Sequence, residues 1–155
     1  MTNLKKHALG QLLLRSEDDN FTLAELSKVR IKCDKVYWHR TLRINYTTYD
    51  LCRMQDSLNP RTHADIMLLS PDNDSKDKHP YVYARIVGLF HTDFSYSNTR
   101  TAHRTYTRLD IAWIRWFQMD SSHSSGFTLK RLPRLQFLQH SDSGAFSFID
   151  PQLII

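Results

Sequence analysis

Two segments of the chain alternate, with a period of two, between side chains that face an interior and side chains that face solvent. They are residues 79–91 (HPYVYARIVGLFH) and 108–118 (RLDIAWIRWFQ), both rich in β-branched and aromatic residues. Such runs are typical of half-buried strands. Because consecutive strands are usually neighbours, we expect residues 81–91 to pair antiparallel with residues 109–118. In the first segment the alternation assigns one face to Val82, Ala84, Ile86, Gly88 and Phe90, and the other to Tyr81, Tyr83, Arg85, Val87 and Leu89.

Shorter segments are also predicted to be ordered. Thr22 and Glu25 have the spacing of a capping box, which favours a short helix over residues 22–27. Asp150 followed by Pro151 is typical of the start of a helical turn. Pro133 interrupts one of the apolar runs and favours an edge strand there. The further strands are expected over residues 29–36, 42–46, 66–69, 129–138 and 146–149.

Polar segments separate these elements and are predicted to be loops. They cover residues 49–63, 71–79, 93–107 and 121–126. The first ends in NPRTH (residues 59–63), where Asn59 before Pro60 is a turn signal. We expect this to be an ordered, structural turn in which Arg61 bonds to Asp56 or Asp65.

The elements together predict a mainly β fold, a small antiparallel barrel that is closed or nearly closed, with short N- and C-terminal helical segments. With 155 residues the chain is most simply one domain. We assign residues 1–28 to an N-terminal extension with a short helix and residues 29–155 to the barrel. Since natural termini are usually polar, the apolar end formed by residues 153–155 leads us to expect truncation at the C-terminus.

Composition and charge narrow the class of protein. A hydrophobic fraction of 41% with 24% charged residues is typical of a folded globular chain. No run approaches the roughly 18 apolar residues of a membrane helix, and the apolar part of residues 1–15 is too short for a signal peptide. We therefore expect an intracellular protein. The net charge of +5 lies mainly in residues 78–155, which contain 9 Lys and Arg residues and 5 Asp residues. This excess of positive charge is compatible with a nucleic-acid or acidic partner.

The cysteines and histidines give no metal-binding pattern. Cys33 and Cys52 are expected to be thiols, one or both buried as small apolar groups. Cys33 with His39, or Cys52 with His63, would supply only two ligands each, whereas a structural zinc site needs four at short, paired spacings. We expect no metal and no cofactor.

Three carboxylates, Asp50, Asp56 and Asp65, lie close together in the sequence beside several basic residues. A nuclease would need two of them to converge on a metal ion or a water molecule. The alternative, which we favour, is that they cap turns and pair with neighbouring arginines.

Aromatic and basic side chains are the candidates for binding. Trp113 and Trp116 should point to opposite faces of their strand, so that one lies in the core and the other nearer the surface. An exposed tryptophan near Tyr81 and Tyr83 would suit a peptide or a methylated lysine through cation–π attraction, although ordinary core packing explains the same residues. The candidates for phosphate contacts are Arg100, Arg104, Arg108, Lys130, Arg131 and Arg134, which would otherwise solvate loops and protect an edge strand.

Several motifs follow one another between residues 41 and 155: NYTTYD (45–50), NPRTH (59–63), DIMLLS (65–70), HPYVYARIVGLFH (79–91), WIRWF (113–117) and AFSFIDP (145–151). In these motifs the chain resembles uncharacterised proteins of mushroom-forming fungi (basidiomycetes) that are encoded near or within DNA transposons. The resemblance implies a mobile-element context and no particular mechanism. In that group we expect a basic residue at the position of Cys52 and a chain that continues past Ile155.

A fainter resemblance, in the order of motifs, is to the bromo-adjacent homology (BAH) domain, a chromatin interaction module built on a small β-barrel. YARI (83–86), IRWF (114–117) and the pair Asp150-Pro151 follow in the order of that domain. Gln118-Met119 stands where that domain has an Arg-Pro pair. The resemblance implies a barrel of the Src-homology type and a chromatin partner.

Residues and resemblances together favour a non-enzymatic, nuclear interaction module, tied to a fungal transposable element, that binds a chromatin protein or DNA. DNA binding would be weak and salt-dependent, and with about three phosphates neutralised the slope of log affinity against log salt would lie near −3. Two alternatives remain. One is a nuclease or transposase-associated domain that uses Asp50, Asp56 or Asp65, and the other is an inert remnant of a mobile element.

Overall fold

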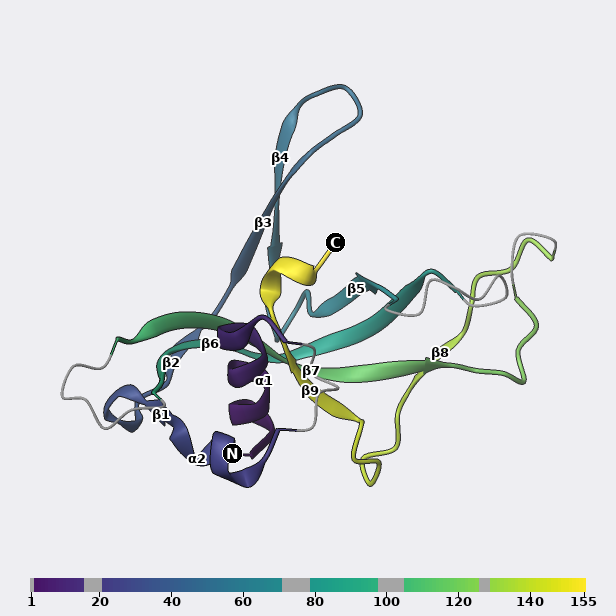
Figure 1. Ribbon diagram of the computed structural model, residues 1–155. Helices are drawn as coiled ribbons and strands as arrows, with labels where there is room; N and C mark the ends of the chain where they lie inside the picture. Colours follow the sequence, from purple (N-terminus) through teal and green to yellow (C-terminus); the bar gives the residue numbers. More distant parts are fainter. Residues whose placement is uncertain (1, 16–20, 71–78, 98–104, 126–128) are drawn as a thin grey trace.

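The computed structural model describes residues 2–15, 21–70, 79–97, 105–125 and 129–155 (Figure 1). Strands make up 48% of the structure and helices 18%, so the predicted mainly β class is confirmed. Seven strands form one antiparallel sheet, and a two-stranded hairpin projects from it. The predicted loop over residues 71–79 lies almost wholly outside the described residues.

The elements follow one another in this order: α1 (Thr2–Leu13), α2 (Leu23–Lys28), β1 (Val29–Ile31), the 3-10 turn η1 (Lys32–Asp34), β2 (Tyr37–His39), β3 (Leu42–Thr47), β4 (Arg53–Leu58), β5 (Asp65–Leu69), β6 (Tyr81–Tyr96), β7 (Thr107–Met119), β8 (Leu135–Phe137), β9 (Phe146–Ile149) and the 3-10 turn η2 (Pro151–Leu153).

The two long strands β6 and β7 form the centre of the sheet. They pair antiparallel from Ala84 opposite Trp116 to Phe94 opposite Thr107, which confirms the predicted pairing. β6 also runs further than predicted, to Tyr96, because Phe94 is fully buried and holds the strand in the sheet where a loop was expected from residue 93.

A β-bulge interrupts the β6–β7 register between Ile86 and Gly88. It inserts Val87 as an extra residue, and an extra residue reverses which face the following side chains occupy. Leu89 therefore packs in the same core as Ala84 and Ile86, while Phe90 packs in a different one. The uninterrupted alternation predicted for this strand is wrong beyond Ile86.

The sheet is open rather than closed. β1, β2 and β5 lie one after another along the free edge of β6, and β8 and β9 pair with β7. In the described part of the chain no strand pairing joins these two edges, so the predicted closed barrel is not observed. The predicted strand over residues 129–138 contributes only the three residues of β8, which begins just after Pro133. Proline cannot donate a backbone hydrogen bond to the sheet.

Each face of the sheet carries an apolar core. The hairpin-side core lies under β3, β4 and the C-terminal segment, and it includes Ile66, Ile86 and Ile114. The helix-side core lies under α1 and α2 and includes Phe94 and Ile111. Both cores are needed because β6 and β7 have apolar side chains on both faces.

The N-terminal helices pack on the helix-side core, α1 through the buried Leu4, Ala8 and Leu9 and α2 through the buried Leu26. The predicted capping box of α2 is confirmed: the Thr22 hydroxyl accepts from Glu25 N at 3.2 Å, and the Glu25 carboxylate accepts from Thr22 N at 2.8 Å. The Thr22 backbone N and hydroxyl both donate to the Glu25 carboxylate, and these two hydrogen bonds lower the pKa of Glu25. No helix among the described residues is long and apolar enough to span a membrane.

The predicted strand over residues 29–36 is broken by η1. Cys33 and Asp34 adopt left-handed backbone angles there, with φ of 54° and 52°. This turn lets the chain leave β6 after β1 and rejoin it as β2, opposite Leu89 to His91. Cys33 is exposed in the turn, so the burial predicted for it is wrong.

The hairpin β3–β4 replaces part of the loop predicted over residues 49–63. β4 pairs with β3 from Leu58 opposite Leu42 to Arg53 opposite Thr47. All but one of the β4 side chains are exposed, so the strand has no apolar alternation that sequence analysis would detect. Cys52, next to the hairpin turn, is a second exposed thiol, and its predicted burial is wrong as well.

We predict that replacing Gly88 with alanine displaces the ring of Trp38. A Cβ atom at Gly88 would lie 2.5 Å from Trp38 Cζ3, closer than a carbon contact allows. Gly88→Ala should cost about 1 kcal/mol of stability, the lower end for overpacking, and should change tryptophan emission. Urea denaturation of Gly88→Ala in the parent and in a Trp38→Ala background measures the coupling. An equal cost in both backgrounds would contradict the contact.

Candidate functional site

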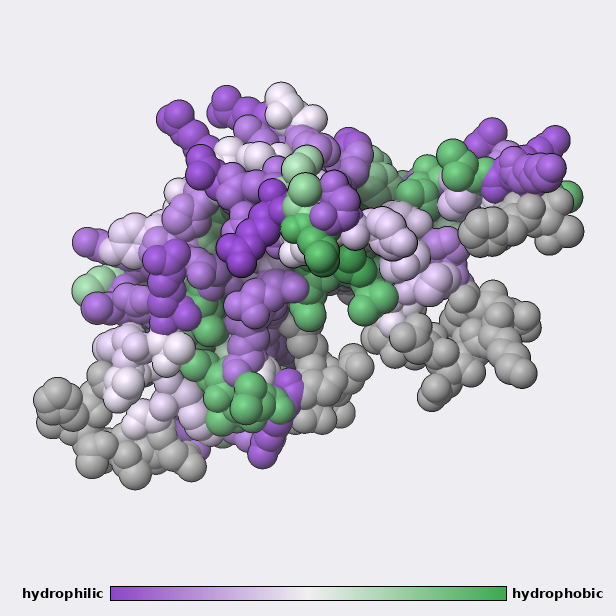
Figure 2. Space-filling model, turned by 90° about the horizontal axis from the view of Figure 1, so that it is seen from above, coloured by the Kyte–Doolittle hydropathy of each residue, from purple (hydrophilic) through white to green (hydrophobic). Residues whose placement is uncertain are grey.

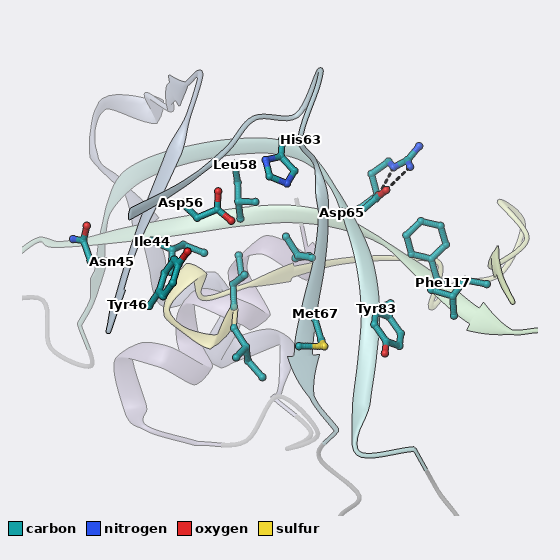
Figure 3. A pocket seen from close by; sticks show the side chains of 15 residues that line it. Ile44, Asn45, Tyr46, Asp56, Leu58, His63, Asp65, Met67, Tyr83 and Phe117 are labelled. Carbon is teal, nitrogen blue, oxygen red and sulfur yellow. Dashed lines mark hydrogen bonds and ion pairs between the residues drawn. The ribbon is translucent and has the colours of Figure 1, made fainter. Parts of the chain in front are cut away.

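A groove of about 950 Å³ runs along β5, and we call it the β5 groove (Figure 3). On one side of β5 the groove is lined by side chains of the β3–β4 hairpin, and on the other side by side chains of β6 and β7. Seen from above, hydrophobic residues form one group near the middle and further groups at the lower edge and on the right, within a mostly hydrophilic surface (Figure 2). The lining that matters for binding comes from Ile44, Asp56, Leu58, His63, Met67 and Tyr83.

The hairpin side of the β5 groove combines an apolar floor with a polar rim. Ile44 and Leu58 pack on the hairpin-side core and form the floor. Asp56 lies opposite Ile44 in the hairpin and accepts a hydrogen bond from Ser57 N at 2.8 Å. Figure 3 shows the Asp56 carboxylate and the His63 ring on this side of β5. The groove therefore offers apolar contact area next to a carboxylate.

Asp65 and Arg85 form a bidentate ion pair on the other side of β5. Arg85 Nε lies 2.6 Å from Asp65 Oδ1, and Nη2 lies 2.7 Å from Oδ2. The hydrogen bond to Asp65 raises the pKa of Arg85. The two residues are direct partners in the β5–β6 register, which explains why Arg85, and not the predicted Arg61, binds Asp65.

The NPRTH segment is an ordered turn, as predicted. Asn59 N donates to His63 O at 2.8 Å, and His63 N donates to Asn59 O at 3.0 Å. Arg61 N donates to the Asn59 side chain at 2.9 Å. This turn connects β4 to β5 and places the His63 ring in the β5 groove.

The C-terminal segment lies along the outer edge of β5. Ile154 forms an antiparallel bridge with Leu68, and Ile155 N donates to Met67 O at 3.1 Å. This contact shows that the outer edge of β5 accepts an extended backbone. Asp150 caps the preceding turn by accepting from Gln152 N at 2.9 Å, as predicted for the start of η2.

The three candidate nuclease carboxylates do not meet at one point, although Asp56 and Asp65 both line the β5 groove. Asp50 lies in the hairpin turn, where hydrogen bonds from Thr48 and then Cys52 lower its pKa. Asp56 lies further down β4, and Asp65 is paired with Arg85. Among the described residues, the one group of three metal-ligating side chains that meets contains none of them.

The candidate aromatic residues are divided between the two faces. Trp113 packs against the helix-side core and Trp116 against the hairpin-side core, so their predicted opposite orientation is confirmed. Both are half-buried, so neither is the exposed tryptophan that was expected. Trp116 Nε1 also donates to Ser147 Oγ at 2.9 Å. Tyr81 and Tyr83 instead contact the ring of His79. An exposed tryptophan exists elsewhere, at Trp38 in β2, 63% exposed.

The candidate basic residues form no single patch in the described part of the chain. Arg108 pairs with Asp110 at one end of β7, and Arg134 pairs with Asp120 just beyond the other end. From Arg108 to the end of β7 at Met119 the strand spans roughly 36 Å. Lys130 and Arg131 are exposed near β8, and Arg100 and Arg104 lie outside the described residues.

A second polar cluster was not predicted from the sequence. His39 on β2 and His91 on β6 bring Nε2 and Nδ1 to 2.6 Å, beside Asp110 on β7. Burial, and then Arg108 and His39, lower the pKa of His91. The three residues are far apart in the sequence and carry no motif, so only the strand register brings them together.

No family model matches this chain. No curated protein and no solved structure matches it either.

We predict that the Asp65–Arg85 pair contributes less than about 1 kcal/mol to stability. Its geometry is bidentate, but both side chains are about half exposed, so water and salt screen the attraction. A double-mutant cycle with Asp65→Asn and Arg85→Gln, followed by urea denaturation, measures the coupling energy. Raising the salt concentration should reduce it. A coupling well above this value, unaffected by salt, would show that the pair is a structural anchor.

Proposed function

We propose that this chain is a non-enzymatic interaction module that binds an extended, basic segment of a protein partner in the β5 groove. The observation that carries the proposal is the position of the groove: it lies beside a strand edge that already accepts extended backbone from the chain's own Ile155. Addition of a strand to a sheet edge is a common mode of peptide recognition, in which alternate side chains enter pockets. At β5 the added segment would replace the backbone contacts that Ile154 and Ile155 make there.

The floor of the groove favours apolar side chains on the bound segment. Ile44 and Leu58 supply apolar surface on the hairpin-side face of the sheet, and Met67, Tyr83 and Phe117 supply it on the opposite face, where they alternate with residues of the hairpin-side core. In an extended segment every second side chain points to the same side. A segment with aliphatic residues at alternate positions would therefore place them along one of these two apolar surfaces.

The rim of the groove favours a basic segment. Asp56 and Asp65 are acidic, and only Asp65 has a cation, Arg85, as its partner in the described structure. A lysine or arginine next to the aliphatic residues would pair with Asp56. Extended basic segments are typical of chromatin proteins, so the groove suits the chromatin partner, nuclear location and mobile-element context that the sequence resemblances favour. A BAH-like relation of the fold is part of the same proposal.

The test uses three short labelled peptides with the purified chain. One alternates lysine and valine, the second alternates glutamate and valine, and the third is the first peptide with proline at alternate positions. Fluorescence anisotropy should show micromolar binding of the lysine peptide and weaker binding of both others. The glutamate peptide loses the charge match, and the proline peptide loses the backbone donors of an added strand.

Matched variants place the binding in the groove. Asp56→Asn should weaken the lysine peptide about fivefold, the equivalent of one exposed ion pair. Tyr46→Ala, within the groove, should weaken it as well, whereas Tyr49→Ala, an exposed tyrosine in the hairpin turn, should have no effect. Equal affinity for all three peptides, or an equal loss in both tyrosine variants, would contradict the proposal.

DNA binding is tested in parallel by mobility-shift titration. Because Arg108 and Arg134 are ion-paired and lie near opposite ends of β7, we expect no shift of duplex DNA at moderate salt. A shift with a salt slope near −3, lost in the Arg104→Glu/Arg131→Glu double variant, would replace the peptide proposal with a nucleic-acid one.

A further inference from the structure

His39, His91 and Asp110 meet on the hairpin-side face because of the strand register. His91 lies directly opposite Asp110 in the β6–β7 pair and directly opposite Tyr37 in the β2–β6 pair. His39 follows Tyr37 by two residues, so it occupies the diagonal position on the same face. Directly opposite and diagonal residues in an antiparallel sheet are within reach of one another's side chains.

The two imidazoles face each other through nitrogen atoms. His39 Nε2 lies 2.6 Å from His91 Nδ1, the ring planes differ by 22°, and the ring centroids are 4.8 Å apart. The Tyr37 ring stacks on His91 with an interplanar angle of 12° and holds it in this orientation. Such a contact needs either an N–H on one ring that donates to the lone pair of the other, or a cation between the two lone pairs.

Asp110 completes a set of three ligands. The ligand atoms of His39, His91 and Asp110 all lie within 4.8 Å of one another. Arg108 donates to Asp110 through Nη2 at 2.8 Å and Nε at 3.2 Å, and both bonds reach Oδ1. The positive charge of Arg108 disfavours the binding of a cation nearby, but its two hydrogen bonds also orient the Asp110 carboxylate. Among the described contacts, Oδ2 stays available to a metal.

We propose that His39, His91 and Asp110 bind a zinc ion. Zinc takes imidazole nitrogen and carboxylate oxygen in tetrahedral geometry, with Zn–N bonds of about 2.0 Å, which places two nitrogen ligands about 3.3 Å apart. The observed separation of 2.6 Å requires the rings to part by roughly 0.7 Å. His39 and Asp110 also line a cavity of about 830 Å³, which leaves room for water or another ligand as the fourth donor.

The site differs from the β5 groove in position and chemistry. It lies where β2 pairs with β6, beyond the bulge, whereas the groove lies where β5 pairs with β6. Two histidines and one carboxylate select a first-row transition metal rather than Mg²⁺ or Ca²⁺, which prefer oxygen ligands. The proposal does not depend on peptide binding.

The test measures zinc binding by calorimetry with the chelator-treated full chain. A Cys33→Ser/Cys52→Ser background is used throughout, because both exposed thiols would bind zinc on their own. We expect one zinc ion per chain, a rise in melting temperature on zinc addition, and no competition from magnesium. Cobalt should bind in the same place and produce the visible absorption of a tetrahedral site.

Substitutions of the proposed ligands show which side chains bind the zinc ion. His39→Gln and Asp110→Asn should each weaken zinc at least about tenfold, and His123→Gln, a histidine outside the cluster, should leave the affinity unchanged. His39 and Asp110 are exposed, so these variants should fold, and circular dichroism confirms it. Absence of zinc binding to the parent, or parental affinity in either ligand variant, would overturn the proposal.

Discussion

The antiparallel pairing of β6 with β7 is the interaction on which the rest of the structure depends. Every other strand of the large sheet pairs with one of these two. The short strands β1, β2, β5, β8 and β9 have three to five residues each and form only as additions to this ladder. The long pair also separates the hairpin-side core from the helix-side core, because its side chains are apolar on both faces.

The bulge at Val87 determines what each face carries. Before the bulge, Tyr83 and Arg85 share a face and contribute to the β5 groove. Beyond it, Leu89 and His91 occupy the opposite face from the one that a regular strand would give them. Without the extra residue, His91 would lie on the helix side of the sheet. One inserted residue thus brings His91 to the face on which His39 and Asp110 lie.

The sequence allowed the prediction of features with a local cause. The capping box at Thr22 and Glu25, the turn at Asn59 and the cap at Asp150 each need only a few neighbouring residues, and all three are present. The pairing of β6 with β7 followed from two long alternating runs. The β3–β4 hairpin was missed because almost all β4 side chains face solvent, so the apolar alternation that marks a strand is absent.

Features that depend on register could not be predicted in this way. The Asp65–Arg85 pair and the cluster around His91 join residues on different strands, and a change of register by one residue would abolish both. The same dependence explains why both candidate sites lie along β6. Its free edge pairs in succession with three short strands, β1, β2 and β5. Side chains of these strands, such as His39 and Asp65, are exposed yet held in position by the pairing with β6, a combination that binding sites require.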